Sequence, residues 1–376
     1  MHEGSKPHSD GAVRDVVASV ASTADGLSVA RFIDRQTPGN VGVALSGGGS
    51  RSASACMGQL RALHALGLLD DVRAISSVSG GSWLSAAWTF LPPDHADEDF
   101  WGPTVQDPGA LVLVGEGDVP GAGLGQISER CFAHAITQRS FDVGSFAPGM
   151  LELNARGVSR TRSWQTLIAE RLYAPLGLYH GDERGRPRSF FCFDQAAADA
   201  ARRANPGLES LRARVVKPPG PGEARRPFYI CNAGMWVIDA QGEPAIAPVQ
   251  GTPFFVGITP QLDARDAHGQ PVGGSVVTPH AFGGQLLERS GSQITVRQES
   301  SFALSDIVGI SSAFHAEMLL DRDIEDFIVP EYVYFHPSAD PPAGRSCHFL
   351  DAGDLENLGI ASLLSYDDID AVVAFA

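Results

Sequence analysis

A strand-length apolar run, a glycine-rich turn and a helical stretch follow one another twice near the start of the chain. The first unit is VGVALS from Val41, then GGGSR, then ASACMGQLRALHALGLLD with apolar residues at helical spacing. Gly67 predicts the end of that helix. The second unit is VRAISSVS followed by GGSWLSAAWTFL. This alternation predicts an α/β fold with a central, largely parallel sheet flanked by helices.

The rest of the sequence is less regular. Residues 1–40 predict a peripheral N-terminal segment with a weakly amphipathic helix, and residues 41–376 predict a single α/β domain. Within about 92–330, Gly- and Pro-rich pieces such as DARDAHGQPVGG separate short apolar runs, which predicts insertions that form an irregular cap over the sheet. SDIVGISSAFHAEMLL predicts a helix, and CHFLDAGD and DIDAVVAFA predict two more strands.

Composition narrows the classes of function. The formal net charge is −16 and the only lysines are Lys6 and Lys217, which argues against a nucleic-acid partner and a polybasic membrane anchor. The N-terminus lacks a secretory signal pattern, and no apolar run approaches the roughly 18 residues that span a bilayer. We therefore expect a cytoplasmic protein that can act peripherally at membranes. The five scattered cysteines predict buried thiols, not disulfides or a zinc site.

Four serines lie within ISSVSGGSW, residues 75–83, and one of them is a candidate nucleophile. A nucleophilic serine needs a sharp turn and an adjacent base. Ser79 lies where the predicted strand gives way to the helix, and Gly80 and Gly81 allow the backbone to close tightly there. Its context departs from G-x-S-x-G in the first position, so a glycine-rich turn that merely caps a helix remains an equal alternative for this stretch alone.

The other glycine-rich turn, SGGGSRSA from Ser46, predicts an anion-binding loop. Gly47, Gly48 and Gly49 let backbone N–H groups point at one anion beside a helix N-terminus, as an oxyanion hole requires. Dinucleotide and P-loop fingerprints both fail here. Arg51 adds a fixed positive charge that can hold a phosphate.

A carboxylate near the C-terminal end is the candidate base. Asp351 stands in D-A-G after a strand-like run. It could take the serine proton directly if its pKa were raised or its hydrogen bond tight, because an ordinary aspartate is a poor base at neutral pH. Asp354 and Glu356 are alternatives, but their places beyond the strand end suggest that they face water.

These three motifs, in this order, resemble the cytosolic phospholipase A2 and fungal phospholipase B family, relatives of patatin. That family is marked by S-G-G-G-x-R, a serine in G-x-S-G-S, and D-[SAG]-G followed by an N-[IL]-P-like stretch. This chain has SGGGSR from Ser46, SVSGGSW around Ser79 and DAGDLENLGI from Asp351. SWQTLIAERL, VVTPHAFGG and ALSDIVGISSAF also look like family segments, so the resemblance spans about residue 40 to the end.

The resemblance implies a lipid acyl hydrolase with a Ser79–Asp351 dyad and no catalytic histidine. It also implies an oxyanion hole in the 47–49 loop, a lipid phosphate held by Arg51, and no cofactor or metal. Three departures leave substrate choice open: Ser77 replaces a frequent glycine, Gly81 a frequent serine, and Leu358-Gly359 an Ile-Pro pair. Head group, acyl position and oligomeric state do not follow from the sequence.

Two other functions remain as alternatives. One is an α/β-hydrolase esterase with a Ser–His–Asp triad, although its oxyanion loop is commonly HGGG-like and Leu45-Ser46 precede the glycines here. Its histidine would be His280, His315 or His348. The other is a catalytically inert protein that binds lipid or an anion at the glycine loop.

Overall fold

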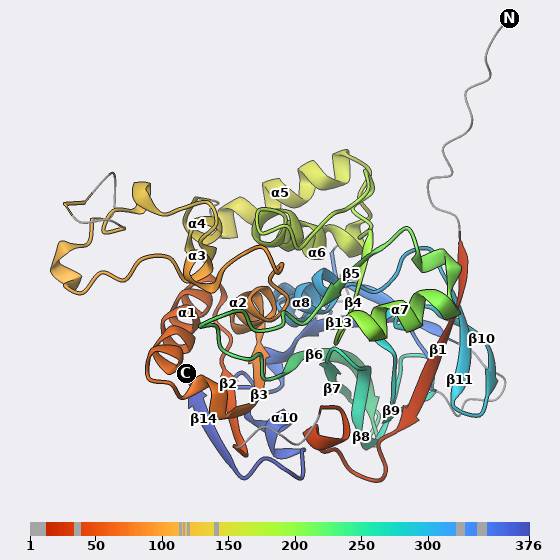
Figure 1. Cartoon of the computed structure of the whole chain (residues 1–376). Coiled ribbons are helices and arrows are strands. Elements are labelled where there is room, and N and C mark those ends of the chain that lie inside the picture. Colours follow the sequence, from red (N-terminus) through yellow and green to blue (C-terminus); the bar gives the residue numbers. More distant parts are fainter. Residues whose placement is uncertain are drawn as a thin grey trace, which may run out of the picture.

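The computed structural model describes residues 13–33, 39–112, 115, 117, 118, 121–138, 143–320, 328–336 and 344–376. Within these residues a 12-stranded sheet runs through the molecule (Figure 1), and a separate two-stranded sheet pairs β4 with β5. The strands are β1 Arg14–Ser22, β2 Val41–Leu45, β3 Val72–Val78, β4 Ser189–Cys192, β5 Arg212–Val215, β6 Phe228–Asp239, β7 Pro244–Gly251, β8 Val256–Arg265, β9 Pro271–Val277, β10 Gln285–Ser290, β11 Gln293–Gln298, β12 Glu331–Tyr334, β13 Arg345–Asp351 and β14 Ala371–Phe375.

Helices lie on both sides of this sheet, so the predicted architecture of a central sheet flanked by helices is confirmed. The α-helices are α1 Gly49–Ala65, α2 Ser79–Thr89, α3 Asp97–Trp101, α4 Phe132–Gln138, α5 Val143–Ala155, α6 Ser163–Ile168, α7 Gln195–Ala204, α8 Leu304–Ser311, α9 His315–Leu320 and α10 Ile360–Leu364. The predicted helix stop is also confirmed, since Gly67 follows α1 with a φ of 68°.

The sheet is mixed, and its parallel part is confined to one side. The strand order is β10-β11-β1-β9-β8-β7-β6-β3-β2-β14, with β13 added to β6 and β12 to β13. Only the pairs β14–β2, β2–β3 and β3–β6 are parallel in this sheet as described, and the other pairs are antiparallel. The expectation of a largely parallel sheet therefore holds only for the two strand–turn–helix units and their neighbours.

Residues 228–298, expected among the insertions of a cap, form strands β6 to β11 of the main sheet instead. The glycine-bearing pieces between β6 and β7, between β8 and β9, and between β10 and β11 are hairpin turns, because antiparallel strands need only a tight connection. In the turn between β8 and β9, the Asp266 amide donates to the Gln270 carbonyl at 2.8 Å and Gly269 has a φ of 82°. The same residues that suggested loops therefore close strand pairs.

The prediction of an N-terminal helix is also wrong. RDVVASVAS forms β1, which pairs antiparallel with β11 along Arg14–Ser19 and with β9 along Val20–Ser22. Val16, Ala18 and Val20 are buried and alternate with outward-facing residues, which is the period of a half-buried strand. Residues 14–22 are thus part of the main sheet; residues 1–12 lie outside the described residues.

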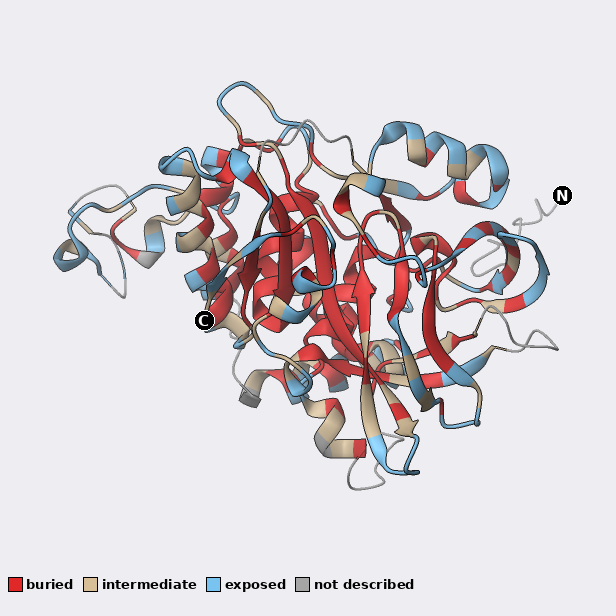
Figure 2. Ribbon diagram, turned by 90° about the horizontal axis from the view of Figure 1, so that it is seen from below, coloured by how far each residue is buried: buried red, intermediate tan, exposed pale blue. Residues whose placement is uncertain are grey.

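Two hydrophobic clusters cover opposite faces of the parallel strands. Val43, Leu45, Ile75 and Cys231 belong to the larger cluster, which includes α1, α2 and α8. Their sequence neighbours Ala44, Ala74 and Ile230 belong to a second cluster with Leu363 of α10 and Tyr366. Successive side chains of a strand point to opposite faces, so this division follows directly from the strand period. Figure 2 shows these strands and helices buried at the centre of the molecule.

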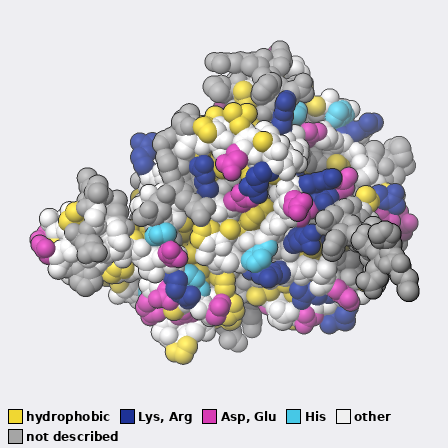
Figure 3. Space-filling model, turned by 90° about the horizontal axis from the view of Figure 1, so that it is seen from above, with side chains coloured by type: hydrophobic (Ala, Val, Ile, Leu, Met, Phe, Trp, Pro, Cys, Tyr) yellow, Lys and Arg dark blue, Asp and Glu magenta, His cyan; other side chains and the backbone are white. Residues whose placement is uncertain are grey.

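Helices α3 to α6 lie above α1, α2 and α8 in Figure 1 and supply the part of the predicted cap that does cover the core. The upper face in Figure 3 carries hydrophobic side chains among interspersed acidic and basic ones. In the described part of the chain, no helix is long and apolar enough to cross a membrane. All five cysteines lie within the described residues and are buried free thiols, as predicted.

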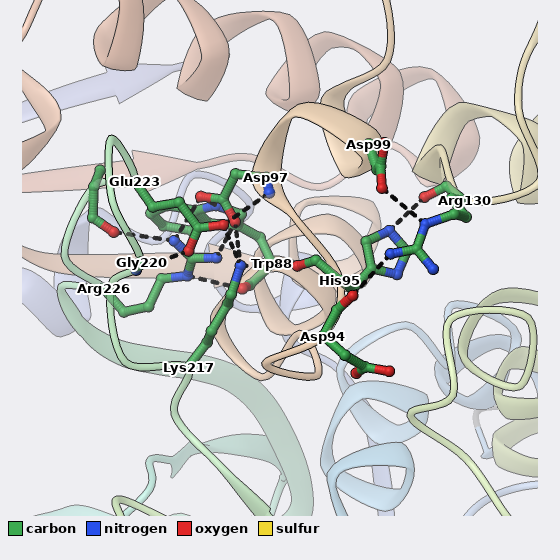
Figure 4. A network of polar contacts seen from close by, with 11 residues as sticks. Trp88, Asp94, His95, Asp97, Asp99, Arg130, Lys217, Gly220, Glu223 and Arg226 are labelled. Atoms are coloured by element: carbon green, nitrogen blue, oxygen red, sulfur yellow. Dashed lines mark hydrogen bonds and ion pairs between the residues drawn. The ribbon is translucent and has the colours of Figure 1, made fainter.

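A buried cluster of four charges holds the C-terminal end of α2 (Figure 4). The carboxylate of Asp97 accepts from the Arg226 guanidinium at 2.6 and 2.8 Å and from the Lys217 ammonium at 3.0 Å, and Lys217 also bonds Glu223 at 2.6 Å. Burial alone would raise the pKa of Asp97, but Arg226 and Lys217 hold it below its ordinary value. Arg226 also donates to the Trp88 carbonyl at 2.9 Å and stacks over that ring.

Candidate active site

Ser79 occupies a strained turn between β3 and α2. β3 ends at Val78 and α2 begins at Ser79, whose φ is 50°. A residue other than glycine in this left-handed region costs about 1–3 kcal/mol and persists only where the surroundings enforce it. The sharp strand-to-helix turn predicted from SVSGGSW is therefore confirmed as a conformation.

The length of β6 brings Ser79 and Asp351 together. β3 runs parallel to the first half of β6 and ends opposite Asn232, and β13 runs antiparallel to the second half and ends opposite Ala233. β7 occupies the other edge of β6. The C-terminal ends of β3 and β13 therefore meet head-on along one edge, and the Ser79 hydroxyl donates to Asp351 Oδ2 at 2.7 Å.

Both side chains of this pair are shielded from water, with exposed fractions of 8% for Ser79 and 3% for Asp351. Burial raises the pKa of Asp351 to about 7, although hydrogen bonds from the Gly353 amide and from Ser79 act in the opposite direction. The Gly353 amide donates to Oδ1 at 2.7 Å, so each carboxylate oxygen has one donor. A carboxyl group with a pKa near neutrality is a competent proton acceptor at physiological pH.

The glycine loop of residues 47–49 lies directly beside the turn at Ser79, as an oxyanion hole next to a nucleophile requires. A Cβ on Gly80 would lie 2.0 Å from the Gly49 carbonyl oxygen, and a Cβ on Gly47 would lie 3.1 Å from Ser79 Cβ. Gly80 thus permits a contact between the two turns that no larger residue would allow, and a Cβ on Gly47 would crowd Ser79. A Cβ on Gly81 would lie 2.6 Å from the Leu45 carbonyl oxygen, so Gly81 lets α2 pack against the end of β2.

The three amides of the glycine loop differ in their partners. The Gly47 amide donates to the Asn357 carbonyl at 2.9 Å. Gly48, with a φ of 141°, caps α1, and Gly49 is the first residue of that helix. The amides of Gly48 and Gly49 have no acceptor among the residues that the structure describes, as is usual for the first turn of a helix.

The other charged candidates lie around this turn. Arg51 is exposed in the first turn of α1 and makes no ion pair or hydrogen bond with any described residue. Asp354 is exposed, and the Glu356 carboxylate accepts from the Leu358 and Ala361 amides at 2.6 and 3.2 Å, at the start of α10. Within the described ranges, no group of three or more His, Cys, Asp or Glu side chains could hold a metal ion.

The three candidate histidines have other places. The rings of His280 and His315 contact the backbone carbonyls of Val17 and Ile328 at 3.4 and 3.1 Å, and burial lowers the pKa of both. His348 lies three residues before Asp351 on β13, so its side chain points to the opposite face of that strand. Asp351 itself occupies the hydrogen-bonding position that a catalytic histidine would take next to Ser79.

This chain is similar in sequence to a human phospholipase. Over 90 residues it is 34% identical to cytosolic phospholipase A2 delta of Homo sapiens, a match that covers 24% of this chain and 11% of that protein. Among solved structures, human GIVD cytosolic phospholipase A2 matches with a TM-score of 0.44 and 15% identity, covering 92% of this chain and 44% of that chain. No family model matches.

A second solved structure of the human GIVD cytosolic phospholipase A2 is its complex with methyl gamma-linolenyl fluorophosphonate. It matches with a TM-score of 0.36 and 19% identity, covering 81% of this chain and 34% of that chain. The chain therefore spans less than half the length of these relatives. Both comparisons match cytosolic phospholipase A2, one of the two groups that the sequence motifs resemble. The resemblance to fungal phospholipase B stays a prediction.

Two residues next to the pair were not singled out from the sequence. Ser311 accepts a hydrogen bond from the Ser79 amide at 3.0 Å. Asn357 lies against the glycine loop and the turn after Asp351, since its Oδ1 would lie 2.1 Å from a Cβ on Gly47 and 2.9 Å from one on Gly353. Asn357 stands in the N-[IL]-P-like stretch, so that motif could have indicated it. Ser311 lies in a segment that predicted only a helix, and nothing in its local pattern marks it.

Proposed function

We propose that this protein is a serine acyl hydrolase that cleaves carboxylic esters of phospholipids or lysophospholipids through Ser79 and Asp351. The observation that carries the proposal is the direct hydrogen bond from Ser79 Oγ to a buried carboxylate whose pKa is raised to about 7. The similarity to cytosolic phospholipase A2 delta supports a phospholipase-type ester hydrolysis.

In the proposed first step, Ser79 Oγ attacks the ester carbonyl carbon while its proton passes to Asp351 Oδ2. The tetrahedral intermediate collapses to an acyl-serine, and the protonated Asp351 returns its proton to the departing alkoxide oxygen. In the second step Asp351 takes a proton from water, whose oxygen attacks the acyl-serine. The fatty acid leaves and Ser79 is regenerated with its proton.

The oxyanion of each tetrahedral intermediate needs preorganised donors. We assign this role to the 47–49 loop together with the amide of Gly80, the residue after the nucleophile. Within the loop, Gly48 and Gly49 are better donors than Gly47, because the Gly47 amide already donates to Asn357. Each donor in such a hole is typically worth about 3 kcal/mol of transition-state stabilisation.

Arg51 is the proposed phosphate ligand. It lies in the first turn of α1, two residues after Gly49, and no described residue neutralises it. A helix N-terminus and a guanidinium favour the same anion. Arg51→Gln should therefore raise KM for a phospholipid substrate several-fold and leave hydrolysis of an uncharged short-chain ester unchanged.

We propose that the enzyme meets its lipid transiently at a membrane or micelle surface from the cytoplasm.

A fluorophosphonate probe tests the assignment of the nucleophile. Intact mass should show one adduct per chain, and peptide mapping should place it on Ser79. Ser79→Ala should abolish both the adduct and ester hydrolysis, whereas Ser54→Ala, an exposed serine on α1, should change neither. An adduct elsewhere, or ester hydrolysis that survives in Ser79→Ala, would refute the proposal. A folded protein that binds lipid but takes no adduct would identify an inert binding protein.

A further inference from the structure

The backbone amide of Ser79 is held by a side chain from a distant part of the sequence. Ser79 N–H donates to Ser311 Oγ at 3.0 Å, and Ser311 is completely buried. Apart from Ile328, Ser79 is the only described residue other than glycine with a positive φ. A conformation of this kind needs an external partner that favours it over the relaxed alternative.

Ser311 is itself fixed by a chain of buried hydroxyl groups. Ser82 Oγ lies 3.0 Å from Ser311 Oγ and 3.3 Å from Ser77 Oγ, and Ser77 Oγ donates to the Ile230 carbonyl at 3.3 Å. Each hydroxyl has one hydrogen to donate. Either Ser82 or Ser311 can donate in the contact between them. A hydroxyl oxygen has two lone pairs, so Ser311 can accept from the Ser79 amide in both cases.

The position of Ser311 is set by α8. The N-terminal end of that helix is anchored where the Asp306 carboxylate accepts from the Ala303 amide at 2.8 Å and from Arg162 at 2.6 Å. Its C-terminal end is closed by Ser312, whose hydroxyl donates to the Val308 carbonyl at 2.9 Å. Ser311 and Ser312 are adjacent and equally buried, but only Ser311 contacts the candidate nucleophile.

We propose that Ser311 is a positioning residue that holds the Ser79 peptide so that the hydroxyl of Ser79 points at Asp351. The inference rests on the proposed function of Ser79. The hydrogen bond to Ser311 has a second consequence. Because the Ser79 amide donates to Ser311, it is not available to bind the substrate. The ester carbonyl oxygen must then be bound by the amides of Gly48, Gly49 and Gly80.

The test compares Ser311→Ala with Ser312→Ala as the matched control. Removing the Ser311 hydroxyl leaves a buried amide unpaired and frees the turn, so we expect kcat and the fluorophosphonate labelling rate of Ser79 to fall about 10- to 100-fold. KM should change less than about 2-fold, because the ester is bound by other groups. Ser311→Thr keeps the acceptor oxygen and should recover most of the labelling rate.

Ser312→Ala removes a hydroxyl of equal burial from the same helix end, and its labelling rate should stay within about 3-fold of the unmodified protein. Equal labelling of Ser311→Ala and the unmodified protein would overturn the inference. So would equal losses in the Ser311→Ala and Ser312→Ala variants, since the effect would then belong to the helix end. If Ser311→Ala does not fold, Ser311→Cys, a weak acceptor of similar size, replaces it with a smaller expected loss.

The failure of this inference and that of the proposed function are distinguishable. If the unmodified protein takes no adduct on Ser79, the nucleophile assignment is wrong and Ser311 has nothing to position. If Ser79 is labelled at the same rate with and without the Ser311 hydroxyl, the nucleophile stands and only the role of Ser311 is wrong.

Discussion

The protonation of Asp351 couples the stability of the protein to its proposed chemistry. The pKa of this carboxyl is about 7 in the folded chain, against an ordinary value of 3.8, because burial disfavours its charged form. The folded state therefore binds more protons than the unfolded state between these two values, and the free energy of unfolding falls as pH rises from about 4 to about 7. Above about pH 7 the carboxyl is charged in both states, so the destabilisation of the folded state reaches its full value and no longer changes with pH.

Asp351→Asn should remove this penalty. The two side chains are nearly isosteric: the amide oxygen can still accept from Gly353, and the amide N–H₂ can donate to Ser79 Oγ. One pKa unit corresponds to about 1.36 kcal/mol, so the charged carboxylate costs up to about 4 kcal/mol at pH 8. The stability advantage of Asp351→Asn over the unmodified protein should grow by about 2 kcal/mol between pH 5.5 and pH 8, since about 1.5 units of the shift lie within that interval.

Urea unfolding of both proteins at pH 5.5 and pH 8 measures this difference. Asp354→Asn, an exposed carboxylate in the same turn, is the control and should show no such growth. Asp351→Asn should also lose ester hydrolysis, whereas kcat/KM of the unmodified protein should rise tenfold per pH unit below about 7 and level off above it, because only the ionised carboxylate accepts the proton. A stability difference that does not grow with pH would refute the account of Asp351.

Three further outcomes follow from the structure. Arg226→Met leaves buried Asp97 with a weaker set of cations and should lower the free energy of unfolding by about 3–5 kcal/mol, measured by urea unfolding against an exposed-site control, Arg130→Met. Gly80→Ala places a Cβ 2.0 Å from a backbone oxygen, so fluorophosphonate labelling should fall by at least about tenfold. Single alanine substitutions of His280, His315 and His348 should leave the labelling rate of Ser79 within about 3-fold of that of the unmodified protein. A variant that loses labelling would restore the alternative of a Ser–His–Asp triad.

The two strand–turn–helix units could be predicted because their signals are local. In each unit an apolar run of strand length, a glycine turn and helical spacing of apolar residues lie within about 18 to 25 consecutive residues, and β2, α1, β3 and α2 form there. The strained turn at Ser79 could also be predicted from local sequence, because a chain that turns so sharply needs small residues on both sides of the turn. The buried thiols likewise follow from dispersed cysteines.

The antiparallel half of the sheet could not be predicted in the same way. RDVVASVAS alternates well enough for a strand, but its partners β9 and β11 lie more than 250 residues further along the sequence. The glycine turns of the segment 228–298 suggest loops and hairpins equally, and only pairing decides between them. The single helix expected over SDIVGISSAFHAEMLL is two helices in the structure, since α8 ends at Ser311 and α9 begins at His315. Ser312, the C-cap of α8, has a hydroxyl that bonds back to the carbonyls of its own helix, a contact that weakens a helix locally.

The sequence by itself determined the residue types of the candidate site and the turns that carry them: a serine at a glycine elbow, a glycine loop at a helix N-terminus, and an aspartate after a strand. The tertiary structure decided their meeting. β6 is long enough to pair with β3 and β13 along one edge, so the ends of two strands more than 270 residues apart place Ser79 Oγ 2.7 Å from Asp351. Burial then raises the pKa of that carboxyl, because desolvation depends on what surrounds a group and not on its neighbours in sequence.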